Sequence, residues 1–321
     1  MDKTVRLWHV SVDGECLRTF NHTDFVTCVQ FHPSNDKVFM SGSIDGKVRL
    51  WNIPRIHVLD FADCHQMVTA ASFSPDGDQV AVGTMAGKCR FYACRDTKLT
   101  YEAQLNVCTV KGRNRKITGI RFMPTDKTKV LITSNDSRLR LYNTTEYQQC
   151  CKYKGLINKN AQIRASFSGN GRYILCGSDQ GQVFVWSTVN PLIPAVNPSY
   201  TAFRKDKNSS YEAFQGLTDI ATVALFAPEL WHRRFHEEAP EHVAPVAELT
   251  KAVSALLRTD TAAGVADSPL SGDSPAGGNL DSAAKGSELN SAFSMFGEVI
   301  VAAGHRGEIC IFENSGLPHW L

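Results

Sequence analysis

The sequence predicts an all-β fold built from repeated four-stranded sheets, and three observations predict it. One strand motif recurs six times, and its closing aromatic residue falls at positions 8, 51, 92, 142, 186 and 312, so most intervals lie in the low forties. Apolar and polar residues also alternate in the segments between the motifs. Such a period, with four short strands per unit, is typical of a β-propeller blade. The six copies are TVRLW (4–8), KVRLW (47–51), KCRFY (88–92), RLRLY (138–142), QVFVW (182–186) and EICIF (308–312).

The remaining strands of each unit follow from the same alternation. Inner strands should end at turns with Pro or Gly, and second strands should lead through a tight turn into the aromatic-ended motif. Outer strands should carry charged and polar residues, as sheet edges do. The expected inner strands are 25–33, 67–77, 116–124, 162–171 and 219–228; the expected second strands are VFMSGS, QVAVGT, VLITSN, YILCGS and EVIVAAG; the expected outer strands are ECLRTF, HVLDFAD, TYEAQLNV and QQCCKYK.

The chain is expected to hold one propeller domain with one interruption. Residues 1–228 should form the blades, and residues 297–321 should complete the last one. Residues 229–296 are expected to be a long insertion between the first and second strands of that last blade. Its first part has the apolar spacing of a short amphipathic helix over 247–257. Its second part is rich in Ala, Gly, Ser and Asp and is predicted to be disordered.

Two pairs of residues in the insertion have spacings that suggest chemistry. Ser268 and Ser274 each precede a proline and are candidate phosphorylation sites, although Ser-Pro pairs are also common in disordered loops. His232 and His236 are four residues apart, a spacing that metal ligands can have. Because prolines interrupt this stretch, we interpret the two histidines as surface residues rather than ligands.

The composition argues against several classes of protein. With 321 residues, a net charge of +2 and a pI near 8.0, the chain has no overall field that would steer it to nucleic acid or to an anionic membrane. It has no membrane-spanning apolar run and no signal peptide at its start, so a cytoplasmic location is expected. The ten cysteines include no C-x-x-C pair and are expected to be free thiols. We therefore expect no metal, no cofactor and no nucleic-acid partner.

The stretch HTDFVTCVQFHPSNDKVFMSGSIDGKVRLWNI (22–53) resembles a repeat of the WD-repeat family. The resemblance implies a structural network of His22, Ser41 or Ser43, Asp45 and Trp51 within one blade. Although Ser, His and Asp also make hydrolase triads, the sequence has no G-x-S-x-G elbow to present a nucleophile, so no catalytic residue is assigned.

The turn position of Asp45 is not acidic in every repeat. Asp2 and Asp136 occupy the equivalent positions, six residues before the closing aromatic residue. Other residues replace the aspartate in the remaining repeats, and those blades are expected to be held by packing alone. The replacements are Ala86, Gln180 and Arg306.

A closer resemblance is to a subfamily of Rab-GTPase effectors with fungal and plant members. It is carried by KGRNRKITGI, ITSNDSRLRLY, CKYKGLIN followed by QIRASFS, and QVFVWST, and it runs from residue 1 to about 228 and weakly after 297. It implies a scaffold in vesicle and endosome traffic that is peripheral on endosomal or Golgi membranes. In that subfamily the Rab-binding segment precedes the propeller, so no Rab-contacting residue is assigned here.

The opening strand bears on the number of blades. Residues 4–8 match the third strand of a blade, so the chain is expected to hold about five to six blades of a probable seven. Two arrangements are open: an arc cut from a seven-bladed ring, or a five-bladed closure in which ECLRTF (15–20) is the outer strand of the last unit. The subfamily has an internal Met-Asp-Lys-Thr that aligns with Met1, which favours the arc and a chain begun too late.

Other functions remain as alternatives to a traffic scaffold. A ubiquitin-ligase substrate receptor of this family carries W-D-x-R after the third strand, whereas Trp51 is followed by Asn52 and the arginine comes one place late, at Arg55. An RNA-associated scaffold and a propeller enzyme are the further alternatives, and no constellation of titratable groups indicates the enzyme.

The strongest local charge signal is KGRNRK, with Lys111, Arg113, Arg115 and Lys116 within six residues. The segment should join an outer strand to the next inner strand, on the face where propellers usually bind partners, and Arg138 should project from the same face. We interpret it as a candidate anion contact for a phosphoinositide head group, a phosphorylated peptide or an acidic partner segment. The alternative is a solvated basic loop.

Overall fold

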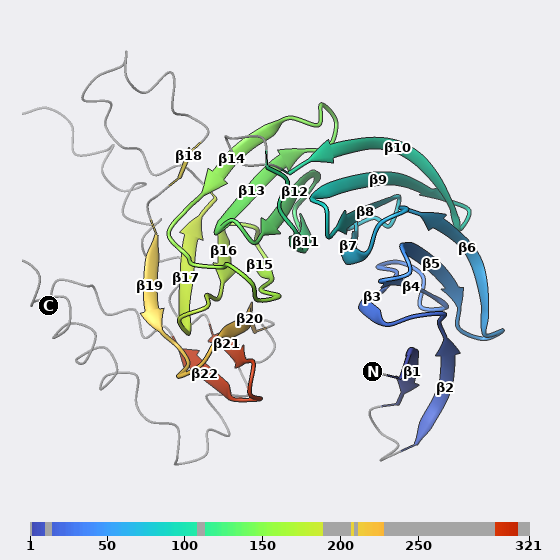
Figure 1. Ribbon diagram of the computed structural model, residues 1–321, viewed down its shortest axis with the longest axis horizontal. Helices are drawn as coiled ribbons and strands as arrows, with labels where there is room; N and C mark the ends of the chain where they lie inside the picture. Colours follow the sequence, from blue (N-terminus) through green and yellow to red (C-terminus); the bar gives the residue numbers. More distant parts are fainter. Residues whose placement is uncertain are drawn as a thin grey trace, which may run out of the picture. The chain divides into compact units, whose positions relative to one another are not determined.

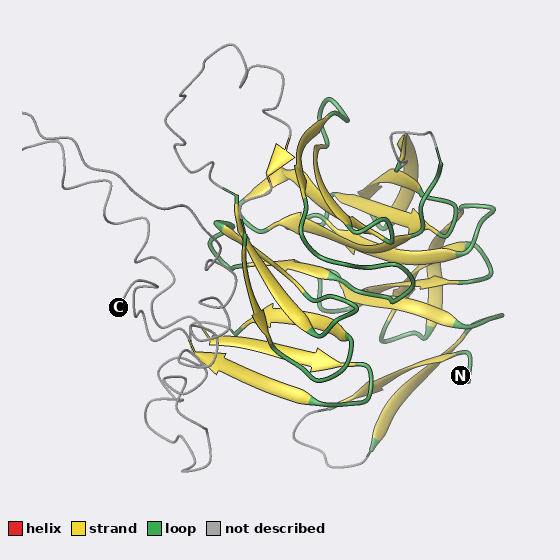
Figure 2. Ribbon diagram, turned by 60° about the vertical axis from the view of Figure 1, so that its left-hand side comes forward, coloured by secondary structure: helices red, strands yellow, loops and turns green. Residues whose placement is uncertain are grey.

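A computed structural model describes residues 2–9, 15–107, 113–188, 207–208, 211–227 and 299–313. All the regular secondary structure in these ranges is β-strand, as Figures 1 and 2 show. The all-β prediction is therefore confirmed. The chain divides into two units, Met1–Phe226 with Ala302–Cys310 and Ala227–Val301 with Ile311–Leu321. The sites discussed below lie in the first unit.

Four sheets have the antiparallel, four-stranded pattern of WD blades, with neighbouring strands mostly consecutive in the chain. Two shorter sheets have orders β1-β2 and β20-β21-β22, and β18 adds a parallel edge to β14. The strands of the four blade sheets are β3 (Val26–Phe31), β4 (Val38–Ser43), β5 (Lys47–Asn52) and β6 (His57–Asp63); β7 (Val68–Phe73), β8 (Gln79–Thr84), β9 (Lys88–Arg95) and β10 (Lys98–Asn106); β11 (Ile117–Met123), β12 (Asp126–Ser134), β13 (Arg138–Asn143) and β14 (Gln149–Tyr153); and β15 (Ala165–Phe167), β16 (Tyr173–Cys176), β17 (Gln182–Ser187) and β19 (Glu212–Gln215). The others are β1 (Thr4–Trp8), β2 (Cys16–Asn21), β18 (Lys207–Asn208), β20 (Ala221–Phe226), β21 (Val299–Gly304) and β22 (Ile309–Glu313).

The opening motif strand pairs with the strand that follows it. β1 and β2 are antiparallel, from Thr4 opposite Asn21 to Trp8 opposite Cys16. The expected alternative, in which residues 15–20 form the outer strand of the last unit, is therefore not what the structure has. Phe20 of β2 packs edge-on against Phe39 and Trp51, which joins this sheet to the next.

The apolar cores lie between neighbouring sheets, so both faces of a blade sheet are buried. In β9, Cys89 and Phe91 pack toward the sheet of β11, whereas Tyr92 and Cys94 pack toward the sheet of β3. A strand buried on both faces does not need strict apolar and polar alternation.

Threonines in the inner strands link one sheet to the next. Thr27 and Thr69 each lie at a register shift of their strand, where a β-bulge redirects the side chain. The Thr27 hydroxyl donates to the carbonyl of Val68 at 2.8 Å, and the Thr69 hydroxyl donates to the carbonyl of Ile117 at 2.6 Å. Arg164 takes the equivalent position before β15, so this unit must be linked differently.

Two strand predictions need correction, and several others are not tested. β15 begins at Ala165 rather than at the predicted residue 162, and sequence analysis placed no outer strand where β19 lies. The predicted insertion with its helix over 247–257, the histidines and the candidate phosphorylation sites lie outside the described residues; these are His232, His236, Ser268 and Ser274.

Candidate functional site

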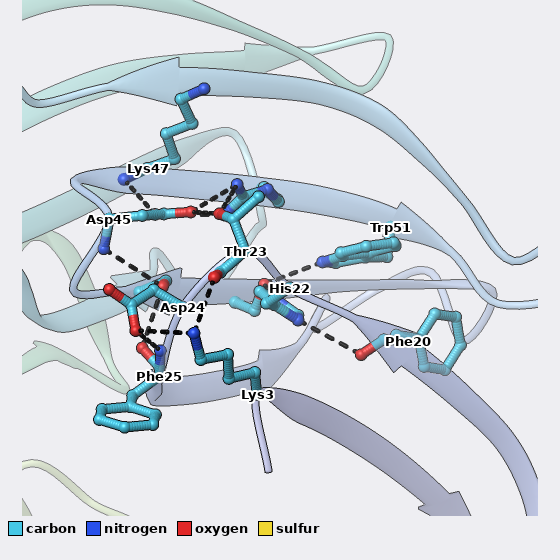
Figure 3. A network of polar contacts seen from close by, with 12 residues as sticks. Lys3, Phe20, His22, Thr23, Asp24, Phe25, Asp45, Lys47 and Trp51 are labelled. Carbon is cyan, nitrogen blue, oxygen red and sulfur yellow. Dashed lines mark hydrogen bonds and ion pairs between the residues drawn. The ribbon is translucent and has the colours of Figure 1, made fainter. Parts of the chain in front are cut away.

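The first polar cluster is centred on the buried hydroxyl of Ser41 on β4. The indole nitrogen of Trp51 donates to this oxygen at 2.8 Å (Figure 3), and His22 Nε2 lies 2.7 Å from it. His22 Nδ1 lies 3.3 Å from the carbonyl of Phe20, which can only accept, so Nδ1 carries the proton and Nε2 accepts from Ser41. Burial lowers the pKa of His22, which keeps the ring neutral.

A serine that donates to a histidine is also the arrangement of a catalytic nucleophile beside its general base. The exposure of the Ser41 hydroxyl therefore decides between a structural and a catalytic role. Ser41 is 1% exposed and also accepts the Trp51 N–H. No substrate carbonyl can approach this hydroxyl. The cluster therefore joins the start of the blade to β4 and β5 and has the geometry of a structural contact.

Asp45 and Ser43 belong to a second cluster, at the turn between β4 and β5. Asp45 accepts from Thr23 and pairs with Arg49, whose Nη2 lies 2.6 Å from Oδ2 (Figure 3). Ser43 donates to the carbonyl of Phe25 at 2.9 Å. Burial opposes ionisation of Asp45, but the bonds from Arg49 and Thr23 outweigh it and hold the pKa of this carboxyl well below its usual range. The predicted single network is therefore two clusters, with Ser41 in one and Ser43 in the other.

Sequence analysis missed Arg49, although its signal is visible as Asp-x-x-x-Arg. The same spacing pairs Asp136 with a buried Arg140 and Asp2 with an exposed Arg6. In each pair the aspartate occupies the turn position, and the arginine is the third residue of the strand that follows. The spacing alone would therefore have been sufficient to predict these pairs.

The blades without a turn aspartate are not held by packing alone, so that expectation was wrong. Arg90 lies four residues after Ala86, which cannot form an ion pair, and donates instead to the carbonyl of Asp63 at 3.2 Å. Beside Gln180, the Ser178 hydroxyl accepts from the amides of Gln180 and Gln182. Polar side chains in these two blades thus bond the backbone by other means.

The basic loop is divided by burial. Arg113 is exposed, whereas Arg115 and Lys116 are half-buried, and Lys111 lies outside the described residues. The amide of Arg115 donates to the carbonyl of Val107, and the turn at Gly87 lies so close that an added Cβ would meet the Arg115 carbonyl at 2.6 Å. A positive φ of 75° and this contact together explain a glycine there.

Arg138 lies at the same end of its sheet as Lys116, and its described hydrogen bond is to the β12–β13 turn rather than to the loop. The register places Ile117 opposite Ser134, and Ser134 opposite Arg138, so the loop and the β12–β13 turn share one end. The Arg138 guanidinium donates to the carbonyl of Ser137 at 2.6 Å. The five predicted cations therefore do not form one described cluster.

The segment before β15 makes contacts that sequence analysis did not predict. The side-chain amide of Gln162 donates to the carbonyls of Thr69 and Thr118, at 3.0 and 2.8 Å. Arg164 lies over Gly119 and donates to the carbonyl of Thr27 at 3.0 Å. Two side chains that precede β15 thus reach the inner strands of three other blade sheets. The motif QIRASFS has a structural role because of these bonds.

Gln162→Met is expected to lower the free energy of unfolding by about 1–3 kcal/mol, because two largely buried carbonyls lose their donors while side-chain volume is kept. Gln79→Met is the matched control, since Gln79 donates to Glu102 at the exposed surface and should change by less than about 0.5 kcal/mol. Urea unfolding followed by circular dichroism measures both. Equal losses in the two variants would contradict this role for Gln162.

The described residues also bear on the metal and membrane predictions. Among them, no three His, Cys, Asp or Glu side chains converge as a metal site requires, and the cysteines there are free. No helix in the described ranges is long and apolar enough to cross a bilayer.

Comparison with known proteins adds to this geometry. A family model described as WD domain, G-beta repeat, matches residues 14–52, 55–92 and 158–187. WD repeat-containing protein 44 of Xenopus laevis is 45% identical over 71% of this chain, and an uncharacterized WD repeat-containing protein of Schizosaccharomyces pombe is 34% identical over 60%. The 2-deoxy-glucose resistant protein 2 of Saccharomyces cerevisiae is 26% identical over 69%. The matches span 25%, 34% and 28% of those proteins, so the chain spans about a quarter to a third of their length.

Proposed function

Because this chain belongs to the WD-repeat family, we propose that it acts as a non-catalytic scaffold that binds other proteins. The observation that carries the proposal is that the polar motif residues bond one another. His22, Ser41 and Trp51 satisfy one another inside a blade, and Asp45 pairs with Arg49 in the next turn. These groups are used within the protein, so binding falls to the exposed ends and edges of the sheets.

The end of the sheets that carries the basic loop is the surface we assign to partners. Arg113 is exposed there, and the turn carboxylates of Asp45 and Asp136 at this end are neutralised by arginines of their own strands. The exposed positive charge of this loop favours an acidic segment of a partner protein.

We extend the proposal to Rab-linked vesicle and endosome traffic, with peripheral location on those membranes. The support is the resemblance of KGRNRKITGI, ITSNDSRLRLY, CKYKGLIN and QIRASFS to the Rab-effector subfamily. Because the Rab-binding segment of that subfamily precedes the propeller, a Rab-type GTPase would be held by a region outside residues 1–321, and this chain would hold other proteins of the assembly.

The test compares two charge reversals at opposite ends of one sheet. Lys111→Glu with Arg113→Glu alters the loop before β11. Arg95→Glu with Lys98→Glu is the control, because these exposed cations flank the β9–β10 hairpin at the other end. The measurement is quantitative affinity capture from cells, with phosphoinositide liposomes tested alongside.

We expect the loop variant to lose vesicle-traffic proteins at least about tenfold, because it reverses two charges facing acidic partners, while the hairpin variant keeps them. Loss confined to the liposomes would assign the loop to lipid head groups. Identical capture by the two variants would remove this end of the sheets as the partner surface.

A further inference from the structure

A pocket of about 320 Å³ is lined by residues at or just before the start of the inner strands β3, β7 and β11. Figure 1 shows where these strands lie in the chain's sheets. Ile44 in the turn after β4, Met67 before β7 and Met85 in the turn after β8 form its apolar wall. The amide of Met85 donates to the carbonyl of Met67 at 2.9 Å, which holds the two turns together. The volume lies at the lower end of the range for ligand pockets, which suits a few side chains of a peptide.

The apolar wall is open to solvent. Met67 and Met85 are both 51% exposed, although they come from different segments of the chain. Exposed apolar side chains that meet in one hollow indicate a binding site more strongly than scattered ones. Methionine is flexible and polarizable, so such a wall adapts to the shape of an apolar partner.

Lys116 supplies the charge of the pocket. It precedes β11 and is half-buried, and burial lowers the pKa of its ammonium group. In the described part of the chain no carboxylate forms an ion pair with it, and the turn carboxylates Asp45 and Asp136 are taken by Arg49 and Arg140. A half-buried cation without a counter-ion loses part of its solvation, and an anion in the pocket would offset that cost.

One arginine lies beside the pocket. Arg164 donates to the carbonyl of Thr27, which also lines the pocket. Within the described ranges Arg164 has no ion pair with a carboxylate.

Gln162 gives the pocket a hydrogen-bond acceptor. Both hydrogens of its amide are donated to carbonyls, of Thr69 and Thr118, which fixes the orientation of the group. Among the described residues no donor reaches its Oε1. That oxygen is available to a backbone N–H of a bound peptide.

We propose that this pocket binds a short segment of a partner protein in which an acidic residue lies beside an apolar one. The apolar side chain packs on Ile44, Met67 and Met85, the carboxylate pairs with Lys116, and a backbone N–H donates to Gln162. This proposal rests on the scaffold function and specifies the chemistry of its partner. A phosphoinositide head group needs several converging cations, whereas the pocket offers one ammonium group and an apolar wall.

The test is selection of random twelve-residue peptides displayed on phage against the whole chain. Parallel selections use Lys116→Met, which keeps the apolar stem, and Met67→Ser with Met85→Ser, which keeps the charge. Lys98→Met at the opposite end of the β9–β10 sheet is the control. Enriched peptides are then synthesised, with matched versions carrying Asn or Gln for Asp or Glu, and their affinities are measured by fluorescence anisotropy.

We expect enrichment of peptides with Asp or Glu next to Leu, Ile, Met or Phe. Lys116→Met and the amide peptides should each weaken binding about tenfold or more, and Lys98→Met should not. Enrichment without acidic residues, no enrichment, or Lys116-dependent binding to phosphoinositide vesicles alone would overturn the proposal. If cellular partners are lost with the loop charge reversal but kept by the double methionine variant, the scaffold function stands and the pocket is not its site.

Discussion

Trp186→Ala is expected to lower the free energy of unfolding by about 3–5 kcal/mol, because it empties the centre of the core between two blade sheets. Trp186 is 0% exposed and stacks on Phe184 at 5.7 Å between ring centroids. Its indole N–H donates to the carbonyl of Lys154 at 3.0 Å, so the substitution also leaves that acceptor without a donor. Urea unfolding followed by circular dichroism avoids dependence on the removed fluorophore.

Trp8→Ala is the matched control for this substitution. Trp8 closes the first motif strand as Trp186 closes the fifth, but its side chain is 51% exposed. A loss of about 1 kcal/mol or less is expected for Trp8→Ala. If Trp186→Ala gives too little folded protein, Trp186→Phe should still unfold at lower urea than Trp8→Phe. Equal losses at the two positions would contradict a core built between successive sheets.

The two tryptophans show what the repeat could and could not predict. The motif placed both residues at the end of a third strand. In the structure Trp8 ends β1, which among the described strands pairs only with β2, and Trp186 lies next to the end of β17, the third strand of its blade sheet. Their burial differs because it depends on which sheets lie on either side, and a strand's own residues do not contain that information. Outer strands such as HVLDFAD could also be predicted from the sequence, since charged residues are typical of sheet edges.

The segment 162–164 shows why β15 was predicted to begin three residues too early. Gln162, Ile163 and Arg164 alternate as a strand should, and Ile163 is buried. The side chains of Gln162 and Arg164 instead bond carbonyls of Thr69, Thr118 and Thr27, far away in the sequence. Hydrophobic periodicity indicates which face of a strand is apolar, but it does not indicate which side chains bond strands that are distant in the sequence.

The candidate site divides in the same way. The Asp-x-x-x-Arg pairs are local, so their spacing was sufficient to find them. The pocket was not predictable, because Ile44, Met67 and Met85 come from separate loops and meet only after two neighbouring sheets are in place. Of the predicted basic loop, Lys116 lines the pocket, and only the structure separates its role from that of the exposed Arg113.

Asp136→Ala is expected to lower the free energy of unfolding at neutral pH by about 3–5 kcal/mol, because it leaves the buried Arg140 guanidinium without its counter-ion. The two side chains are 9% and 4% exposed, and Arg140 also donates to the Ser134 hydroxyl at 2.7 Å. Chemical denaturation of both proteins between pH 3 and pH 7 gives the size and the pH dependence of the loss.

The pH dependence follows from the direction of the Asp136 shift. Burial alone would raise the pKa of Asp136, but the bonds and charge of Arg140 outweigh burial and lower it below the ordinary value. The pair therefore contributes its full stability above the unfolded pKa of about 4 and loses it as pH falls toward the lower folded pKa. The difference between wild type and Asp136→Ala should accordingly shrink below about pH 4.

Asp2→Ala is the control, because Asp2 and Arg6 repeat the same spacing with both side chains about half exposed. Solvent screens that pair, so Asp2→Ala is expected to lose much less stability than Asp136→Ala. Replacing both partners, as in Asp136→Ala with Arg140→Met, should recover part of the stability, since no buried charge is then left unpaired. A double variant as unstable as Asp136→Ala would show that lost packing, rather than the uncompensated arginine, accounts for the cost.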